Sequence, residues 1–557
     1  MRDARKIGWP SLGVIVATGF FALAAQTLLF RVFLSVFEGN ELGLACFFSS
    51  WLLWVVVGAL VARLRLPVMN VLSDRFAFLP LLYLPSYLLQ WWLIGHAREF
   101  AGVRPYELFP LFTMLPVTFL GNAPVSFCTG FLFTLACRWM RAAEGLPVAK
   151  VYIWESVGGV LGGLAVTLLL ARGVAEETVF LGAALALTAP LAVYRLRQRS
   201  YIAAAIPVLA VAVALGSGLG GRWERRHNLR AWQRVVSEQP LRGSFTTPEA
   251  KYLYGEYGDQ FNVVAWETVA DTIPATEHAS EIVAIHLAQR PAARRFLVAG
   301  RGAFSICRRL LALPQAEAIA WFDPDPAYPS RLLSRLPERF KSGVERLDMP
   351  GEDIRRWLAG TRDPYDVIIL DFPDATTLAL NRYFTREFFE LLKAHVSESG
   401  VIGVRISAGE NFMSEDRVNA GASVFATLRS VFPHLVIKPG DESWLMVSGH
   451  PGLTATPATL RDRFAAIPGA GRIYPPDGLM ALYLPQRMEY ERQMFEAAVN
   501  SAPAGLLLNT DRSPRALLHS LLLAAREAGG AASLGRAVRA LALHGLMALP
   551  VGLRLFP

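Results

Sequence analysis

The distribution of apolar residues divides the chain into two unlike parts. Residues 1–220 consist mostly of long apolar runs with short polar loops between them, whereas residues 221–557 mix short apolar runs with charged segments. An α-helix needs about 20 apolar residues to cross a lipid bilayer. The first part offers seven runs of this kind, and we predict a multi-pass transmembrane domain at 1–220 with spans near 11–36, 41–63, 75–96, 107–138, 150–172, 178–194 and 201–219.

Three features within these runs refine the picture. The fourth run contains Gly121-Asn122-Ala123-Pro124, which predicts either a kinked span or a re-entrant pair of helices. The segment GGVLGG (158–163) spaces its glycines for close helix packing, an interpretation we favour over a substrate path. Arg31 and Glu155 place charges inside apolar runs, so each is expected to face a partner or a cavity.

The second part alternates strand-like and helix-like segments. A small β-region at 252–272 and a helix at 277–291 come first. Apolar strands then alternate with amphipathic helices, the strands at 296–300, 318–323, 345–349, 365–371, 400–407 and 435–449 and the helices at 304–313, 327–336 and 384–396. This alternation predicts a parallel, doubly wound α/β sheet. The corresponding domains are a linker with the small β-region (221–295), a Rossmann-like domain (296–500) and a tail (501–557) in which 535–557 is predicted to be an interfacial helix.

Composition fits a membrane protein that carries a globular domain. Hydrophobic residues make up 53% and charged residues 18% of the chain, respectively more and fewer than in a typical soluble protein. The net charge of +9 arises mostly from loops beside the apolar runs, and no basic-aromatic module is present. The lipid bilayer is therefore an expected partner and nucleic acid is not. The cysteines have neither disulfide nor metal-ligand spacing, and no metal site is predicted; they are Cys46, Cys128, Cys137 and Cys307.

The loop charges also predict an orientation in the cell membrane. Twelve Lys and Arg residues flank the runs on the side of the N-terminus and three lie on the opposite side, which places the N-terminus in the cytoplasm. With seven spans, residues 221–557 would then lie outside the cell. They return to the cytoplasm if 107–138 crosses twice or if 201–219 does not cross, so the side they face stays open.

Polar residues gather where the predicted strands end, which is the edge at which such sheets bind ligands. A turn with Gly300 and Gly302 follows the first strand, and Asp323 ends the second, about 20 residues further on, where a carboxylate can accept hydrogen bonds from a ribose. The third and fourth strands are followed by Asp353, Asp371 and Asp374. Each of these acids could serve only as a helix N-cap. Together they favour a cationic or hydroxyl-rich ligand, a nucleoside or an amine, over a dinucleotide.

Four segments resemble the spermidine synthase (polyamine aminopropyltransferase) family, specifically its membrane-fused members. They are TGFFALAAQTLLFRVFLSVFEGNELG (18–43), KVYIWESVGGVLGGLAV (150–166), YDVIILDFPDATTLALNRYFTREFFELLKAHVSESGVIGVRIS (365–407) and LLLNTDRSP (506–514). The family transfers an aminopropyl group from decarboxylated S-adenosylmethionine to putrescine. The resemblance implies a Rossmann-like fold of the methyltransferase type and a small cationic amine as substrate. It also implies decarboxylated S-adenosylmethionine or a related adenosyl nucleoside as co-substrate, with no tightly bound cofactor.

The resemblance further implies roles for individual residues. Asp371 would be the catalytic carboxylate that accepts a proton from the attacking amine, since an amine is a nucleophile only when deprotonated. The substrate-binding residues would be Asp374, Gln260 and His278. The adenosyl group would be held by Gly300, Gly302, Asp323, Asp325 and Asp353. Within that group, the ribose would lie at Asp323 and the adenine near Asp353.

The chain departs from the family at the turn after the first strand. The family has a glycine-rich loop with one aspartate there, and this chain has Ala299-Gly300-Arg301-Gly302-Ala303-Phe304. A cation thus replaces the acid that would hold the charged end of the donor. Two alternatives stay open. One is a catalytically degenerate synthase-like domain that binds a ligand or partner on a transporter-like bundle, and the other is a transport role involving Glu155. A homo-oligomer also stays open.

Overall fold

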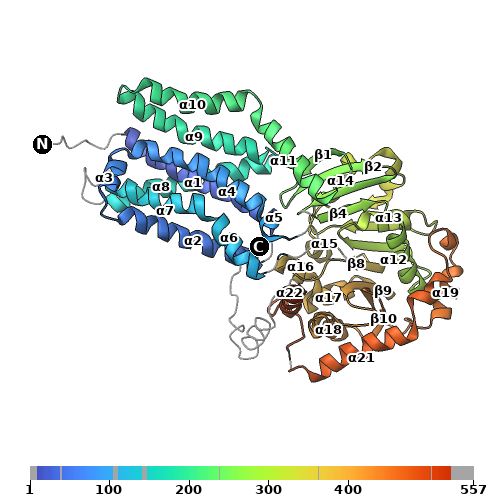
Figure 1. The fold of residues 1–557 in the computed structure, drawn as a ribbon. Coiled ribbons are helices and arrows are strands. Elements are labelled where there is room, and N and C mark those ends of the chain that lie inside the picture. Colours follow the sequence, from blue (N-terminus) through green and yellow to red (C-terminus); the bar gives the residue numbers. More distant parts are fainter. Residues whose placement is uncertain are drawn as a thin grey trace. The chain divides into compact units, whose positions relative to one another are not determined.

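The computed structural model describes residues 9–37, 41–103, 109, 111–140, 147–236, 239–266, 268–361, 363–503 and 505–527. The chain divides into two compact units (Figure 1). The helical unit comprises Met1–Leu253 and Ala265–Thr268, and the α/β unit comprises Tyr254–Val264 and Val269–Pro557. The interfacial helix predicted at 535–557 lies outside the described residues.

The helical unit is built from apolar helices. In chain order they are α1 (Trp9–Val36), α2 (Glu41–Arg63), α3 (Pro67–Asp74), the 3-10 helix η1 (Phe76–Leu82), α4 (Tyr83–Gly95), α5 (Ala97–Ala101), α6 (Leu111–Gly121), α7 (Ala123–Met140), α8 (Pro147–Ala171), α9 (Glu176–Arg197), α10 (Tyr201–Gly216) and α11 (Leu219–Val235). Among the described residues, five helical stretches are long and apolar enough to cross a membrane, and two bent pairs raise the number to as many as seven. The seven predicted spans correspond to the upper end of this range.

The break predicted in the fourth run is present. Thr113–Gly121 and Ala123–Met140 are bent by 46° around Asn122, a buried amide. Its Oδ1 accepts a hydrogen bond from Gln90 Nε2 (2.6 Å), and its Nδ2 donates to the carbonyl of Phe47 (2.9 Å). Since a buried polar group is costly unless it is hydrogen-bonded, these contacts account for a polar residue at the bend.

Helices α1 and α8 pack closely along the glycines of GGVLGG. A Cβ atom at Gly158 or Gly162 would fall inside the backbone of α1, so this approach requires glycine. The helix-packing interpretation is confirmed for these two positions. In the same unit, Arg31 of α1 and Glu176 of α9 form an ion pair (Nε–Oε1 2.9 Å), which gives the charge within the first run its expected partner.

The small β-region is a four-stranded sheet in the order β1-β2-β3-β4. Its strands are β1 (Leu241–Thr246), β2 (Lys251–Tyr257), β3 (Gln260–Ala265) and β4 (Thr268–Ile273). Consecutive strands are neighbours and the links between them are short, which requires an antiparallel arrangement. The sheet begins before the predicted 252–272 because β1, with the sequence LRGSFT, carries no apolar run.

The main sheet has seven strands in the order β10-β11-β9-β8-β5-β6-β7. The strands are β5 (Arg295–Gly300), β6 (Ala318–Phe322), β7 (Leu347–Asp348), β8 (Tyr365–Asp371), β9 (Val396–Ser407), β10 (His434–Lys438) and β11 (Glu442–Ser448). Strands β5 to β9 are parallel, as predicted, but β11 runs antiparallel to both β9 and β10. The prediction of a parallel sheet is wrong at β11, because the link 439–441 is too short for a crossover.

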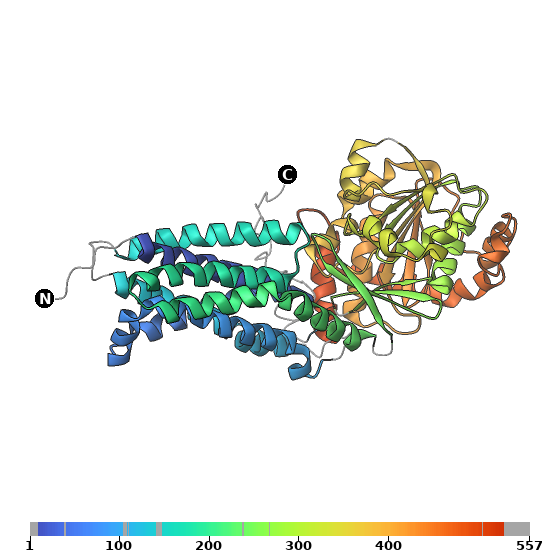
Figure 2. The ribbon, with the colours of Figure 1, turned by 90° about the horizontal axis from the view of Figure 1, so that it is seen from above.

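Helices lie against both faces of the main sheet (Figure 2). The helices of four or more residues in this unit are α12 (Thr276–Gln289), α13 (Ala303–Leu311), α14 (Tyr328–Arg335), α15 (Ile354–Gly360), α16 (Leu378–Asn381), α17 (Arg386–Lys393), α18 (Glu415–Arg429), α19 (Pro457–Ala465), α20 (Gly478–Leu482), α21 (Pro485–Ser501) and α22 (Arg515–Glu527). The central strands are buried on both sides, with residues 367–371 of β8 at most 7% exposed. This burial explains their continuous apolar sequence.

Candidate active site

The carboxyl ends of β5, β6 and β8 meet at one edge of the sheet because these strands are parallel. Gly300 at the end of β5 is in register with Asp371 at the end of β8. Strand β6 ends at Phe322 and is followed at once by Asp323. The structure therefore brings the predicted glycine turn, Asp323 and Asp371 to the same edge.

The backbone conformation of the glycine turn would be strained for any other residue. Gly300 has φ +149°, and a Cβ there would lie 2.5 Å from the carbonyl carbon of Asp371. Gly302 has φ +72° and precedes the first residue of α13, but its nearest neighbour would be 3.7 Å from a Cβ. Only Gly300 is therefore fixed by close approach of another backbone, and that backbone belongs to Asp371.

Asp371 is 7% exposed and has a basic side chain beside each carboxylate oxygen. Arg405 of β9 forms an ion pair with it (Nε–Oδ1 2.7 Å), and His278 of α12 lies on the other side (Nε2–Oδ2 3.9 Å). Arg405 also donates from Nη1 to Glu442 Oε1 of β11 (3.0 Å) and from Nη2 to the carbonyl of Phe372 (2.9 Å). His278 Nδ1 lies 4.0 Å from Glu442 Oε2. Asp371, Arg405, Glu442 and His278 thus form a ring in which acidic and basic side chains alternate, which we call the Asp371 cluster.

The charges of the Asp371 cluster support one another. The carboxylate of Asp371 raises the pKa of His278, and Glu442 acts in the same direction, while burial and Arg405 oppose them. Burial disfavours the guanidinium of Arg405, but the surrounding carboxylates outweigh it and raise the pKa of Arg405. Arg405 and Glu442 were not identified as site residues from the sequence. The signal that could have found Arg405 is a single charge inside the apolar strand VIGVRIS.

Asp323 and Asp325 shape the turn after β6. Asp323 Oδ1 accepts from the backbone amide of Asp325 (2.9 Å), and Asp325 Oδ1 accepts from the amide of Ala327 (3.2 Å). Burial raises the pKa of Asp323 well above its usual range, and Arg301 of the glycine turn opposes this shift. Both acids therefore accept hydrogen bonds from the local backbone, and both are buried.

A further buried acid, Asp271 of β4, belongs to the same region and was not singled out from the sequence. Burial raises its pKa to about 7. Its Oδ2 accepts a hydrogen bond from Tyr328 Oη (3.3 Å), and its Oδ1 is the atom nearest to a Cβ built on Gly302. A lone acid in a short β-region gives little sequence signal, because the helix α12 and the whole of β5 separate it from the glycine turn in sequence.

Two of the predicted substrate-binding residues differ in their surroundings. Asp374 is half-buried, and its Oδ1 accepts from the backbone amide of Ser407 at the end of β9 (3.2 Å). The charge of Asp374 also raises the pKa of Arg405, so Asp374 lies near the Asp371 cluster. Gln260 is exposed at the first position of β3, and none of the contacts given above links it to Asp371. Its predicted role stays a prediction.

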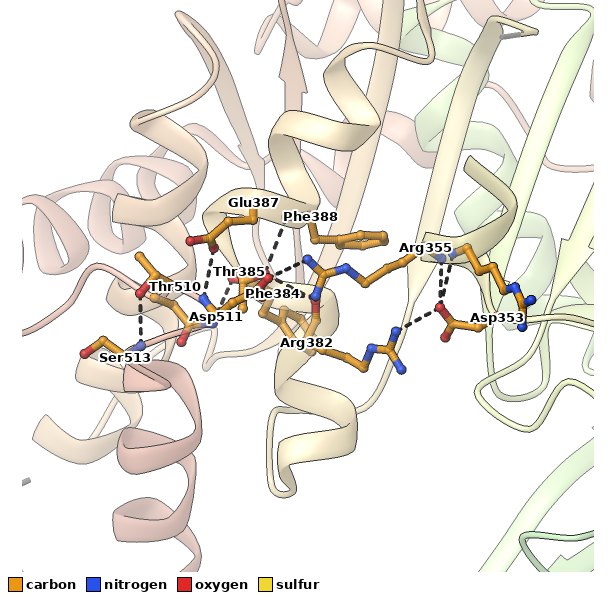
Figure 3. Close-up of polar contacts among 12 residues, drawn as sticks. Asp353, Arg355, Arg382, Phe384, Thr385, Glu387, Phe388, Thr510, Asp511 and Ser513 are labelled. Carbon is orange, nitrogen blue, oxygen red and sulfur yellow. Dashed lines mark hydrogen bonds and ion pairs between the residues drawn. The ribbon is translucent and has the colours of Figure 1, made fainter. Parts of the chain in front are cut away.

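Asp353 is the N-cap of α15. Its Oδ1 accepts from the amides of Arg355 (3.1 Å) and Arg356 (3.3 Å) and pairs with Arg382 Nη2 (2.9 Å), while Oδ2 accepts from Tyr383 Oη (3.1 Å). These contacts, most of them drawn in Figure 3, correspond to the helix-capping alternative raised for each acid. A contact with adenine stays a prediction.

The segment LLLNTDRSP is anchored to α15 and α17 (Figure 3). Asp511 receives two hydrogen bonds from Arg355 (3.0 and 2.8 Å) and one from Thr385 Oγ1 (2.8 Å), and its own amide donates to Glu387 Oε2 (2.9 Å). Asn509 donates from Nδ2 to the carbonyl of Phe384 (2.9 Å). The segment therefore joins the chain near α22 to the helices α15 and α17.

The fold and this edge define a Rossmann-like α/β domain with a glycine turn and buried acids at the carboxyl ends of its strands. Residues 277–434 match the family model of the spermine/spermidine synthase domain. This part of the chain is therefore similar to spermidine synthase domains. Among the described residues, no group of three or more His, Cys, Asp or Glu side chains is placed to hold a metal ion.

Curated relatives share part of their length with the chain. Polyamine aminopropyltransferase 2 of Ralstonia nicotianae is 25% identical over 166 residues, which cover 29% of this chain and 32% of that protein. Polyamine aminopropyltransferase of Oceanobacillus iheyensis is 25% identical over 278 residues, 47% of this chain and 52% of that protein. The chain thus spans between about a third and about half of the length of these relatives.

Two solved spermidine synthase structures are similar to the chain. Spermidine synthase in complex with the transition-state analogue AdoDATO has a TM-score of 0.37 and 14% identity, and covers 46% of this chain and 87% of its own. Spermidine synthase from Thermotoga maritima has a TM-score of 0.37, 13% identity and the same coverage, 46% and 87%.

Proposed function

We propose that the α/β unit is a transferase of the polyamine aminopropyltransferase type, which moves an aminopropyl group from an adenosyl sulfonium donor to a small cationic amine. One observation carries the proposal. Asp371 is a buried carboxylate at the end of central strand β8, in register with the glycine turn at Gly300 and at the same sheet edge as Asp323. A ligand bound over the turn would present its reacting group to Asp371.

The donor would be decarboxylated S-adenosylmethionine or a related adenosyl nucleoside. Asp323 is buried with a raised pKa, and hydroxyl groups that donate to its carboxylate would offset the cost of burying that charge. A ribose offers an adjacent pair of such hydroxyls. The glycine turn would let the chain approach the nucleoside closely, because neither Gly300 nor Gly302 has a side chain.

The acceptor would be an amine held by Asp371 and Asp374. Asp371 ends β8 and Asp374 lies on the segment that follows it, where an ammonium or amine group can be oriented toward the donor. In the transfer, the amine nitrogen forms a bond to the propyl carbon while the carbon–sulfur bond breaks and leaves a neutral thioether. The amine then releases a proton, and the Asp371 cluster would receive it.

The helical unit would anchor the transferase in the cell membrane. Its five to seven apolar helices are compatible with a multi-pass arrangement. We place the α/β unit in the cytoplasm, where adenosyl donors occur, which requires an even number of crossings from a cytoplasmic N-terminus. Helix α10 is the span that we expect not to cross, since its 16 residues reach about 24 Å against a hydrocarbon core of about 30 Å. Six of the seven spans then cross the membrane.

A ligand-binding module without turnover is the second candidate. Two arginines favour it: Arg301 stands in the glycine turn, and Arg405 already neutralises Asp371 at 2.7 Å. Such a module would bind an adenosyl nucleoside without releasing a thioether.

The test uses the purified full chain in detergent, with decarboxylated S-adenosylmethionine and putrescine. We expect release of the thioether methylthioadenosine, and we expect Asp371→Asn to lower its rate by about 100-fold or more. Asp366→Asn is the matched control on the same strand, because Asp366 accepts from the amides of Arg294 and Arg295 at the opposite end of β8. Binding of the donor with no thioether release would favour the second candidate.

A further inference from the structure

We infer that His278 accepts the proton from the attacking amine, with Asp371 and Glu442 holding its ring between them. This inference rests on the proposed function and refines it. It assigns Asp371 an orienting role and moves proton acceptance to a residue on a different element, α12. The guanidinium of Arg405 opposes protonation of the His278 ring.

The contacts of Asp371 lead to this assignment. Its Oδ1 is paired with Arg405, which is itself held by Glu442 and by the carbonyl of Phe372. A proton placed on Asp371 would therefore break an ion pair whose arginine is fixed by two further contacts. The other oxygen, Oδ2, faces His278. A proton that reaches the cluster is held at lower cost on the imidazole than on the carboxylate.

The position of His278 suits a proton acceptor. Its side chain is 51% exposed, so an amine can reach it, and each ring nitrogen has a carboxylate within about 4 Å. The imidazolium that forms is stabilised by both carboxylates, as an aspartate stabilises the histidine of a catalytic triad.

Among the described residues, three charged groups act on the ring of His278. Asp371 comes from β8, Glu442 from β11 and Arg405 from β9. On its own helix, Glu277 is exposed and Glu281 is paired with Lys438 (2.7 Å). The two carboxylates of the cluster favour the protonated ring, and Arg405 disfavours it.

The step is balanced in atoms and charge. A neutral amine attacks the propyl carbon, the nitrogen–carbon bond forms, and the carbon–sulfur bond breaks with its electron pair left on sulfur. The positive charge moves from the sulfonium to the new ammonium, and the proton of that ammonium passes to His278. The cluster then carries one additional positive charge, which leaves with the proton to solvent through the exposed face of the ring.

The pH dependence of kcat/KM tests the inference with two opposite changes. The neutral ring is the active form, so kcat/KM rises with pH through the titration of His278. Glu442→Gln removes a carboxylate and should move this limb to lower pH by about 0.5 unit or more, whereas Arg405→Gln removes a cation and should move it up by a similar amount. Arg405→Lys keeps the charge and should leave the limb in place. His278→Gln should abolish the limb and lower kcat by about 100-fold.

A second readout follows His278 without turnover. Diethyl pyrocarbonate modifies neutral imidazoles, and mass spectrometry reports the rate at each histidine. The pH of half-maximal modification of His278 should fall in Asp371→Asn and rise in Arg405→Gln. His450 is the internal control, since it is 47% exposed and faces Glu398 at 3.8 Å, and its profile should be the same in all variants.

The outcomes separate the inference from the proposed function. Absence of turnover with a bound donor contradicts the proposed function, and the inference falls with it. Turnover whose acidic limb stays at the same pH in Glu442→Gln and Arg405→Gln contradicts the inference alone. Wild-type kcat in His278→Gln does so as well. Opposite shifts of the limb, matched by opposite shifts in the modification profile, support it.

Discussion

Two glycines of one turn provide a matched pair of substitutions with different expected costs. Both Gly300 (φ +149°) and Gly302 (φ +72°) have backbone conformations that L-residues rarely adopt, so alanine costs about 1–2 kcal/mol at either position. At Gly302 that is the whole cost, because the nearest atom would be 3.7 Å away. At Gly300 the new Cβ would lie 2.5 Å from the carbonyl carbon and 3.0 Å from the Cα of Asp371. Separating β5 from β8 there adds about 1–3 kcal/mol.

We therefore expect Gly300→Ala to lower the free energy of unfolding of the α/β unit by about 3 kcal/mol and Gly302→Ala by about 1 kcal/mol. The assay is pulse proteolysis of the full chain in detergent across a urea series. Because the clash at Gly300 displaces Asp371, Gly300→Ala should also abolish thioether release even where the unit stays folded. Equal losses of stability in the two variants, or full turnover in Gly300→Ala, would refute the close approach to Asp371.

Three further predictions concern other parts of the chain. Asp511→Asn should lower the free energy of unfolding at pH 7 by about 1 kcal/mol after screening. Although burial acts in the opposite direction, Arg355 and Thr385 lower the pKa of Asp511, so in a urea series this difference should begin to shrink near pH 4 and should vanish as pH falls through the lowered pKa of the folded state. Burial raises the pKa of Glu491 to about 7, so the folded unit keeps a proton that the unfolded chain loses above about pH 4.3. The free energy of unfolding should therefore fall by roughly 3 kcal/mol between pH 4.3 and 7. Glu491→Gln should lack this fall, and a wild-type profile that is also flat would contradict the prediction. A reporter fused after residue 240 should fluoresce as a cytoplasmic protein, and phosphatase activity there would contradict the proposed orientation.

The strands with continuous apolar sequence were predictable because burial on both faces leaves no polar position. Strand β8 matches its predicted range, 365–371, and this fixed the position of Asp371. Strand β7 shrinks to Leu347–Asp348 because residues 344–346 form a 3-10 turn. Such an edge strand has one neighbour and little apolar sequence, so local pattern overestimates it.

The partners of Asp371 were harder to predict. Arg405 lies on β9, which pairs with β8 directly, and Glu442 lies on β11, which reaches this edge only through its antiparallel pairing with β9. Strand order of this kind follows from tertiary packing, which local periodicity does not report. Asp353 illustrates the opposite case. Its sequence position allowed both a ligand contact and an N-cap, and the cap accounts for two of its hydrogen bonds.

The central claim is that the sheet edge around Asp371 transfers an aminopropyl group. The most direct measurement incubates the purified full chain with decarboxylated S-adenosylmethionine labelled in its propyl group and with putrescine, and quantifies both products by mass spectrometry. We predict that the labelled propyl group appears on the amine in equal amount to the thioether, and that Asp371→Asn forms both products more slowly by about 100-fold or more. Donor binding without label on any amine would contradict the claim.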